Sequence, residues 1–538
     1  MIGSLVIAAN LVLLNGKIWT GDDRNRFVEA VAIEGNQIVA VGHDDAVLAV
    51  APRDVKRIDL RGRLVVPGFI DNHAHFLDGG LQLSRVKLRD AASPAEFAKR
   101  IADFAKSSGK GAWVLGGEWD EQLWTPYQLP RRQMIDAVTP DNPVFVSRLD
   151  GHMALANSVA LRLAGITGDS EDPPGGTIVR DENGEPTGLL KDAAMDKVFA
   201  VIPSATPEER IRGAKAALKE AARYGVTTIN DMSGSDAYED FHAYQALDRA
   251  GELTSRLYLF TPISRYERLV AAGVEKRFGS PRLRIGALKG FSDGSLGSST
   301  AAFFEPFAGE PENRGLLMEP MTDGSMRKWV TAADKANLHI GIHAIGDRAN
   351  DEVLKIMESI PNHRERRFRI EHAQHLTPDL IKRFASQRVI ASMQPYHAID
   401  DGRWAEKKIG PERAKGTYAF KSLLDAGVTL TFGSDWTVAP LSPILGIYAA
   451  VTRRTIDGKN PKGWVPQEKI SVEQALRCYT VNNAFAMFAE NEIGKIAPGM
   501  LADLVVLSDD LFKIAPEKIE DVKVDVTIVD GSVVYERK

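Results

Sequence analysis

The sequence predicts an α/β fold: a (β/α)8 barrel of the TIM type, a β-sandwich built from both ends of the chain, and a lobe inserted after the first barrel strand. Three observations support this prediction. In the middle of the chain, short apolar runs alternate with longer helical stretches, which is typical of βαβ units around a parallel sheet. Both ends consist of short alternating strands separated by turn residues. The interval between the first two barrel strands is far too long for one helix.

The β-sandwich is expected from residues 1–62 and 490–538. Near the start, LVLLNGKIWTG and VEAVAIEGNQIVAVG alternate apolar and polar residues around turns. The segments 501–507 and 524–535 show the same pattern of short apolar strands. The opening MIGSLVIAANLVLLNGKIW lacks a cationic start, and Asn10 and Asn15 interrupt its apolar stretch. We therefore interpret it as a strand pair, and we expect a cytoplasmic protein that does not span a membrane.

The barrel is assigned to residues 63–80 and 216–489, and the inserted α/β lobe to residues 81–215. Eight apolar runs serve as barrel strands, which is the number that a TIM-type barrel needs; they lie at 64–70, 226–229, 256–260, 284–288, 339–342, 368–370, 389–393 and 430–432. The lobe has strands and turns of its own, such as WVLGGEWDE and TIVRDENGEPTGLL. We expect it to fold over the mouth of the barrel.

Composition narrows the function classes. At ~150 residues per domain, 538 residues suggest several domains or one large barrel with attachments. The 67 Lys and Arg nearly balance the 72 Asp and Glu, which argues against a nucleic-acid-binding protein, and 44% hydrophobic residues argue against disorder. The single cysteine, Cys478, provides neither a disulfide nor a thiolate cluster. Any metal must therefore be held by His, Asp, Glu or Lys.

Residues that suit a metal follow the predicted strands at their C-terminal ends. His73 and His75 occupy alternate positions of an extended segment, which places them on one side, about 6 to 7 Å apart. Four later strands end at the other candidates, which are Lys289, His343, His372 and Asp435. In a closed barrel these ends meet at one mouth, and imidazole and carboxylate groups suit zinc or a similar divalent ion. The set can hold one or two ions.

Lys289 leaves two alternatives open. Its ammonium group cannot be a ligand, but its carbamate, formed with carbon dioxide, would be an anionic oxygen bridge between two ions. Desolvation beside cations would lower the pKa of Lys289 and favour this N6-carboxylation. Alternatively, Lys289 is an ordinary ammonium paired with a carboxylate such as Asp293, and the site then holds one metal.

Five segments resemble the amidohydrolase superfamily, and within it amidohydrolase family 3, the group similar to N-substituted formamide deformylase. They are PGFIDNHAHF, ALKGFSDGSLGSSTA, GIHAIGD, RIEHAQ and TFGSDW. The resemblance implies that His73, His75 and Asp435 bind the more buried metal. It also implies that His343 and His372 bind a second metal, with carboxylated Lys289 as the bridge. Ser299 stands where many relatives carry Arg, so no contact with a substrate anion is inferred from that position.

The expected activity is hydrolysis of a non-peptide C–N bond in a small molecule. A divalent ion lowers the pKa of bound water toward ~7 and polarises a carbonyl, so that hydroxide attacks an amide. Asp435 would accept the proton of that water and return it to the leaving nitrogen. The resemblance implies an amide or an N-substituted formamide-like substrate. The alternatives within enzymes are hydrolysis of an ester, a lactone or a cyclic imide, or an isomerisation or decarboxylation at the same site. The alternative outside enzymes is a scaffold without activity.

Substrate contacts are expected from the lobe and from loops after the barrel strands. The candidates are Trp119, Asp150, His152, Gln394, His397 and Trp436. The alternative for Trp119 is a core aromatic, and for His152 a hydrogen-bonded structural residue. If several of the aromatic residues face the pocket, they would favour an apolar or aromatic group on the substrate nitrogen. These aromatic residues are Trp119, Trp124, Tyr127, Tyr396, Trp404 and Trp436. Glu371 precedes His372 on a strand, so its side chain should point away from that ligand. Sheet edges of the sandwich are compatible with a homodimer.

Overall fold

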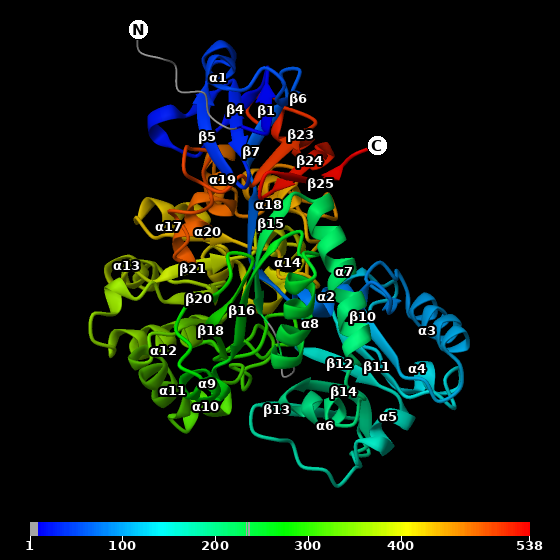
Figure 1. Ribbon diagram of the computed structural model, residues 1–538. Helices are drawn as coiled ribbons and strands as arrows, with labels where there is room; N and C mark the ends of the chain where they lie inside the picture. Colours follow the sequence, from blue (N-terminus) through cyan, green and yellow to red (C-terminus); the bar gives the residue numbers. More distant parts are fainter. Residues whose placement is uncertain (1–8, 233, 235–236) are drawn as a thin grey trace.

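The computed structural model describes residues 9–232, 234 and 237–538, and it contains the predicted barrel (Figure 1). Eight parallel strands lie side by side in chain order. They are β8 (Phe69–Ala74), β15 (Val226–Met232), β16 (Arg256–Pro262), β18 (Leu283–Phe291), β19 (His339–Ala344), β20 (Arg369–His372), β21 (Ile390–Met393) and β22 (Leu430–Phe432). Most of their residues are buried, as expected of strands covered on both faces. The predicted (β/α)8 fold is therefore confirmed.

The seam between the last and the first barrel strand is bridged by a side chain. Asn483 lies on α20 (Val481–Ala486), and its Nδ2 donates hydrogen bonds to the carbonyl oxygens of Ile70 at 2.6 Å and of Phe432 at 2.8 Å. Beyond the strands, the amide nitrogen of Asp435 donates to the carbonyl oxygen of His73 at 2.6 Å. These contacts hold the ends of β8 and β22 together, so residues after the two strands share one edge of the barrel.

Helices around the barrel form where the sequence supplies an apolar stripe and an N-terminal cap. In α7 (Pro207–Arg223), Thr206 and Glu209 form a capping box, and buried residues recur at helical spacing. The other long helices are α8 (Ala237–Arg249), α11 (Ser325–Lys335), α12 (Asp347–Glu358), α13 (Pro378–Gln387) and α18 (Pro443–Thr452). Among the described residues, no helix is long and apolar enough to cross a membrane.

The two ends of the chain meet in two facing sheets, drawn in blue and red at the top of Figure 1. One sheet has the order β5-β4-β1-β6 and the other β25-β24-β23-β7-β2-β3. The strands are β1 (Leu11–Leu14), β2 (Lys17–Trp19), β3 (Phe27–Val28), β4 (Ala30–Glu34), β5 (Gln37–Gly42), β6 (Lys56–Asp59), β7 (Leu64–Pro67), β23 (Leu504–Leu507), β24 (Val524–Val529) and β25 (Ser532–Glu536). Leu13, Ile33, Val65 and Leu504 pack in one core between the sheets. The first eight residues of the predicted opening strand pair lie outside the described residues.

One predicted strand is divided by the structure. The sequence predicts one barrel strand at 64–70, but β7 pairs with β2 and β23 of the sandwich, and the barrel strand β8 begins only at Phe69. Gly68 lies between them, and a Cβ atom there would come within 2.2 Å of the Thr227 hydroxyl oxygen. Because the apolar run is continuous, its composition does not reveal the change of sheet.

The inserted lobe lies between β8 and β15 and has its own sheet, drawn in cyan and teal in Figure 1. The order is β13-β14-β12-β11-β10-β9. The strands are β9 (Val86–Lys87), β10 (Val114–Trp119), β11 (Val144–Arg148), β12 (Met153–Ala156), β13 (Gly176–Arg180) and β14 (Pro186–Asp192), with helices α3 (Pro94–Ser108), α4 (Gln133–Asp136), α5 (Ser158–Leu163) and α6 (Asp196–Phe199). Helices α2 (Phe76–Gln82) and α7 pack together where the chain leaves and re-enters the barrel.

Candidate metal centre

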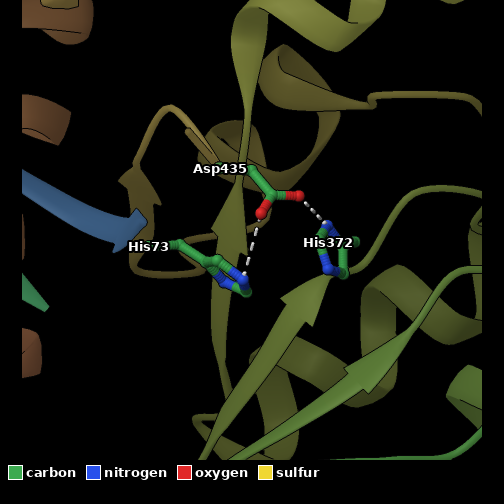
Figure 2. A group of neighbouring side chains, drawn as sticks. All are labelled: His73, His372 and Asp435. Carbon is green, nitrogen blue, oxygen red and sulfur yellow. Dashed lines mark ion pairs between the residues drawn. The ribbon is translucent and has the colours of Figure 1, made fainter. Parts of the chain in front are cut away.

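Three of the predicted ligands form a compact buried group at the C-terminal ends of the barrel strands. His73, His372 and Asp435 each offer a ligand atom, and these atoms lie within 4.8 Å of one another. Figure 2 shows the carboxylate of Asp435 between the two imidazoles. Its Oδ1 lies 3.5 Å from Nε2 of His73, and its Oδ2 lies 3.9 Å from Nδ1 of His372.

The backbone turns sharply at two of these residues. His372 has a φ of 71° and Asp435 a φ of 56°, a left-handed conformation that non-glycine residues seldom adopt. Such a conformation costs on the order of 1–3 kcal/mol and persists where surrounding contacts hold it. His372 ends β20, and Asp435 lies three residues after the end of β22, so each turn directs a side chain toward the centre of the mouth.

His73 is held from both ring nitrogens. Its Nδ1–H donates to Oε2 of Glu371 at 2.7 Å, and its Nε2 lies 3.2 Å from the ammonium nitrogen of Lys289. Burial and the neighbouring Lys289 lower the pKa of His73 to about 4. The ring is therefore neutral at pH 7, which is the form that binds a metal.

Lys289 is buried at the same centre. Burial lowers the pKa of its ammonium to about 8, against the opposing effect of Glu371 and Asp435. The alternative pairing with Asp293 is not found: across the described part of the chain, no ion pair joins these two residues. Instead, Oδ1 of Asp293 lies 3.4 Å from Nε2 of His343, and its oxygens accept backbone N–H groups.

The two remaining imidazoles flank the group. Nε2 of His75 lies 3.3 Å from Oδ1 of Asp435, and the side chain is 30% exposed. His343 donates from Nε2 to the carbonyl oxygen of Gly294 at 3.1 Å, and its ring centroid lies 4.6 Å from that of His372. All six predicted metal-binding residues therefore line one cavity.

This cavity has a volume of about 850 Å³ and lies between the barrel mouth and the lobe. Of the predicted substrate contacts, Asp150, His152 and His397 line it, and so does Trp404. Nδ1–H of His152 donates to Oδ1 of Asp192 at 2.7 Å, and its ring centroid lies 5.1 Å from that of His343. The lobe thus presents an oriented imidazole to the centre.

Three of the residues predicted to contact the substrate do not line this cavity. Trp119 belongs to the lobe core, where it packs against Trp124 and donates from Nε1 to the carbonyl oxygen of Val146 at 2.9 Å. Gln394 is fully buried beside the cavity, and its Oε1 accepts a hydrogen bond from Nδ1 of His372 at 2.8 Å. The ring of Trp436 packs against Phe76.

The remaining aromatic candidates also lie outside the cavity lining. Tyr127 is 61% exposed, and Tyr396 packs at the edge of the barrel core. An aromatic residue that the sequence reasoning missed does line the cavity: Phe291, 42% exposed, whose ring lies 4.8 Å from Nζ of Lys289. Its position two residues after Lys289 on the same strand was the available signal, because alternate residues share a face.

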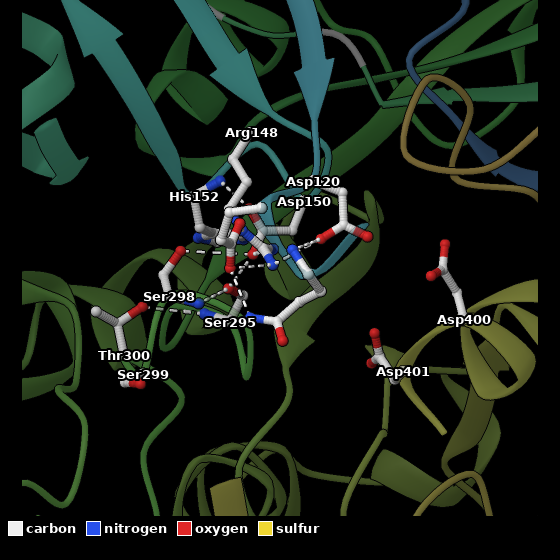
Figure 3. A network of polar contacts seen from close by, with 12 residues as sticks. Asp120, Arg148, Asp150, His152, Ser295, Ser298, Ser299, Thr300, Asp400 and Asp401 are labelled. Atoms are coloured by element: carbon white, nitrogen blue, oxygen red, sulfur yellow. Dashed lines mark hydrogen bonds and ion pairs between the residues drawn. The ribbon is translucent and has the colours of Figure 1, made fainter. Parts of the chain in front are cut away.

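A buried network ties the lobe to the barrel beside the centre (Figure 3). Arg148 donates from Nε and Nη2 to Glu121 at 2.8 and 3.1 Å, and from Nη1 to Asp150 at 2.8 Å. Asp150 in turn accepts hydrogen bonds from Ser295 at 2.7 Å and Ser298 at 3.4 Å, both in the barrel loop after β18. The network fixes His152 and the lobe strands over the mouth.

The donor set fits a divalent cation. Oδ1 of Asp435 is buried and, within the described residues, accepts no well-oriented hydrogen bond. Burial would raise the pKa of Asp435, but the adjacent imidazoles hold it well below its usual range. An ionised carboxylate with an unused oxygen, surrounded by imidazoles, is a set that binds zinc-like ions.

A (β/α)8 barrel with such a donor set at its C-terminal mouth has the architecture of a metal-dependent barrel enzyme. The chain belongs to the amidohydrolase family, whose model matches residues 56–535. It is 40% identical to Protein LONG AFTER FAR-RED 3 of Arabidopsis thaliana, over 98% of this chain and 92% of that protein. It is 28% identical to N-substituted formamide deformylase of Arthrobacter pascens, over 98% of both.

A solved structure extends the likeness to three dimensions. An uncharacterised metal-dependent hydrolase from Pyrococcus horikoshii OT3 superposes with a TM-score of 0.76 at 29% identity, covering 94% of this chain and 99% of that one. The resemblance expected from the sequence is confirmed, and the protein is a hydrolase of this family.

Proposed function

We propose that this enzyme hydrolyses a non-peptide C–N bond in an amide or N-substituted formamide. The observation that carries the proposal is the convergence of four imidazoles, Asp435 and Lys289 on one cavity. The similarity to N-substituted formamide deformylase supports the choice of bond. The cavity volume of about 850 Å³ suits a small molecule.

The donor set would hold zinc. His73, His75 and Asp435 would bind the more buried ion, and His343 and His372 a second ion, with carboxylated Lys289 between them. A bound divalent ion polarises a carbonyl oxygen and lowers the pKa of water. The pKa of about 8 supports carboxylation, because at pH 7 about a tenth of Lys289 is the neutral amine that reacts with carbon dioxide.

The protein's own side chains would orient the substrate and move the proton. Asp435 accepts a proton on its carboxylate from the attacking water and passes it to the leaving nitrogen, which must be protonated to depart. His152, oriented by Asp192, contacts the substrate from the lobe. Phe291 and Trp404 line the cavity and favour an apolar substituent on that nitrogen.

Metal content and turnover of N-substituted formamides test the proposal together. We expect bound zinc in the purified protein, a loss of turnover of at least 100-fold after chelation, and recovery when Zn²⁺ is returned. His372→Ala should lose metal and turnover, whereas His363→Ala, outside the cavity, should keep both. Full activity of metal-free enzyme would refute the metal mechanism, and turnover of esters or lactones alone would refute the proposed bond.

A further inference from the structure

Directly beneath His73, the barrel interior contains a connected set of polar side chains. We call it the Glu371 network, and its members are Asn72, Arg369, Glu371, Ser392 and Thr431. All five are fully buried, and they come from strands β8, β20, β21 and β22. A polar group in the interior of a barrel is costly unless its partners are well placed, so the geometry of this set is informative.

Glu371 is surrounded by donors. Arg369 donates from Nε to Oε1 at 2.8 Å and from Nη2 to Oε2 at 3.0 Å, which is a bidentate pair. Oε2 also accepts from the hydroxyl of Ser392 at 2.6 Å and from Nδ1 of His73 at 2.7 Å. A carboxylate that forms a bidentate pair with a guanidinium is ionised and can only accept.

The tautomer of His73 follows from this contact. Because Glu371 only accepts, the ring hydrogen of neutral His73 must be on Nδ1, and the lone pair must be on Nε2. Nε2 is the atom that faces Lys289 at 3.2 Å and Asp435 at 3.5 Å. A change that released the ring would free it to rotate and to exchange tautomers.

Neighbouring strands fix the position of Glu371 in turn. Nδ2 of Asn72 donates to the hydroxyl oxygens of Ser392 at 2.8 Å and Thr431 at 2.6 Å, and Asn72 accepts from Nδ2 of Asn230 at 2.8 Å. Nη2 of Arg369 also donates to the carbonyl oxygen of Asn72 at 2.8 Å. Asn72 adjoins His73 in the chain, so the network holds both the backbone and the ring of this ligand.

We propose that Glu371 is a positioning residue that sets the divalent-ion affinity of the site by holding His73 with its Nε2 lone pair toward the metal, and that Ser392 supports Glu371 in this role. The inference rests on the proposed function only in requiring a metal at His73. Groups that hold a metal-binding imidazole in this way typically contribute 10–100-fold to affinity.

Graded variants measure the effect. Glu371→Gln keeps an acceptor oxygen of similar size, Glu371→Met removes the acceptor, and Ser392→Ala removes one donor to the carboxylate. The matched control is Thr228→Val, because Thr228 is buried on the neighbouring strand β15 and its hydroxyl has no hydrogen-bond partner within the described chain. Zn²⁺ affinity is measured by competition with a chromophoric chelator, the visible spectrum of the Co²⁺-loaded protein reports ligand geometry, and circular dichroism checks folding.

We expect Zn²⁺ affinity to fall about 10-fold in Glu371→Gln and about 100-fold in Glu371→Met, with an altered Co²⁺ spectrum. Ser392→Ala should lose affinity by a few fold, and Thr228→Val should match the wild type. If Glu371→Met does not fold, the affinities of Glu371→Gln and Ser392→Ala still test the proposal. Wild-type affinity and an unchanged spectrum in both would overturn the inference.

Failure of the proposed function produces a different pattern. A wild-type protein that binds Zn²⁺ but does not cleave formamides would contradict the proposed activity, while the graded affinities would still support the role of Glu371. Conversely, normal turnover with equal affinities in all variants would contradict only the positioning role.

Discussion

Replacement of Arg148 by Met is expected to destabilise the cavity-facing part of the lobe, because its three carboxylate partners all belong to the lobe. The guanidinium is 1% exposed and lies among three carboxylates, those of Asp120, Glu121 and Asp150. Asp150 also accepts a hydrogen bond from the hydroxyl of Ser295 in the barrel loop. Met preserves much of the side-chain volume but removes the only positive charge that touches both Glu121 and Asp150 within the described residues.

The magnitude follows from the number and burial of these contacts. Three hydrogen bonds to carboxylates are lost, each contributing roughly 1.5–3 kcal/mol. Part of the lost stabilisation is recovered, because the carboxylates that lose Arg148 can bind protons or water. Breaking one side of a buried ion pair costs about 3–5 kcal/mol in all. Near 4 kcal/mol, the locally unfolded form of this part of the lobe becomes about a thousandfold more populated.

Hydrogen-exchange mass spectrometry separates the lobe from the barrel. In Arg148→Met, amides of β11 and β12 should exchange up to a thousandfold faster, while amides of β19 and β20 remain protected. Lys99→Met is the control, because Lys99 pairs with Asp103 on the exposed face of α3 and contributes no more than about 1 kcal/mol. Exchange in β11 and β12 that matches the wild type would refute the assigned energy.

Two further predictions concern carboxylates in the cavity. Asp435→Asn should lower kcat about 10²–10⁴-fold with a KM near that of the wild type, and unchanged turnover in steady-state assays would remove its role in proton transfer. Burial raises the pKa of Asp401 to about 7, above 3.8 in the unfolded chain, so the folded protein loses stability as the pH rises from about 4 to 7. One pKa unit corresponds to about 1.36 kcal/mol, so Asp401→Asn should raise the free energy of unfolding at pH 8 by up to about 4 kcal/mol. At pH 4 the substitution should leave the free energy of unfolding unchanged. Equal urea midpoints for the variant and the wild type at pH 8 would contradict this prediction.

The barrel and the metal-binding set could be predicted from the sequence because both depend on local pattern. A buried parallel strand is a short apolar run, and its C-terminal end is known once the run is located. His343 and His372 each end such a run, so convergence follows from barrel closure alone. The division of 64–70 between two sheets was missed, because pairing partners that are distant in sequence decide it.

The substrate contacts were less predictable because the lobe places them. Trp119 lies on a strand that has neighbours on both sides, and whether its ring faces the lobe core or the cavity depends on the register with β11, which shifts next to it. His152 has no apolar pattern that orients it, yet Asp192, forty residues later, holds it toward the cavity. Such pairings form only after the lobe sheet has closed.

The two parts of the site therefore have different structural origins. The metal ligands rest on barrel strands and on buried partners such as Glu371 and Gln394, which come from the same strand ends. Of the substrate-facing side chains, Asp150 and His152 belong to a lobe held by one buried arginine network. Phe291, His397 and Trp404 belong to the barrel. Changes within the lobe can alter which amide fits the cavity without moving the metal ligands, whereas changes in the barrel interior act on the metal itself. This separation allows specificity to vary within a barrel whose chemistry stays the same.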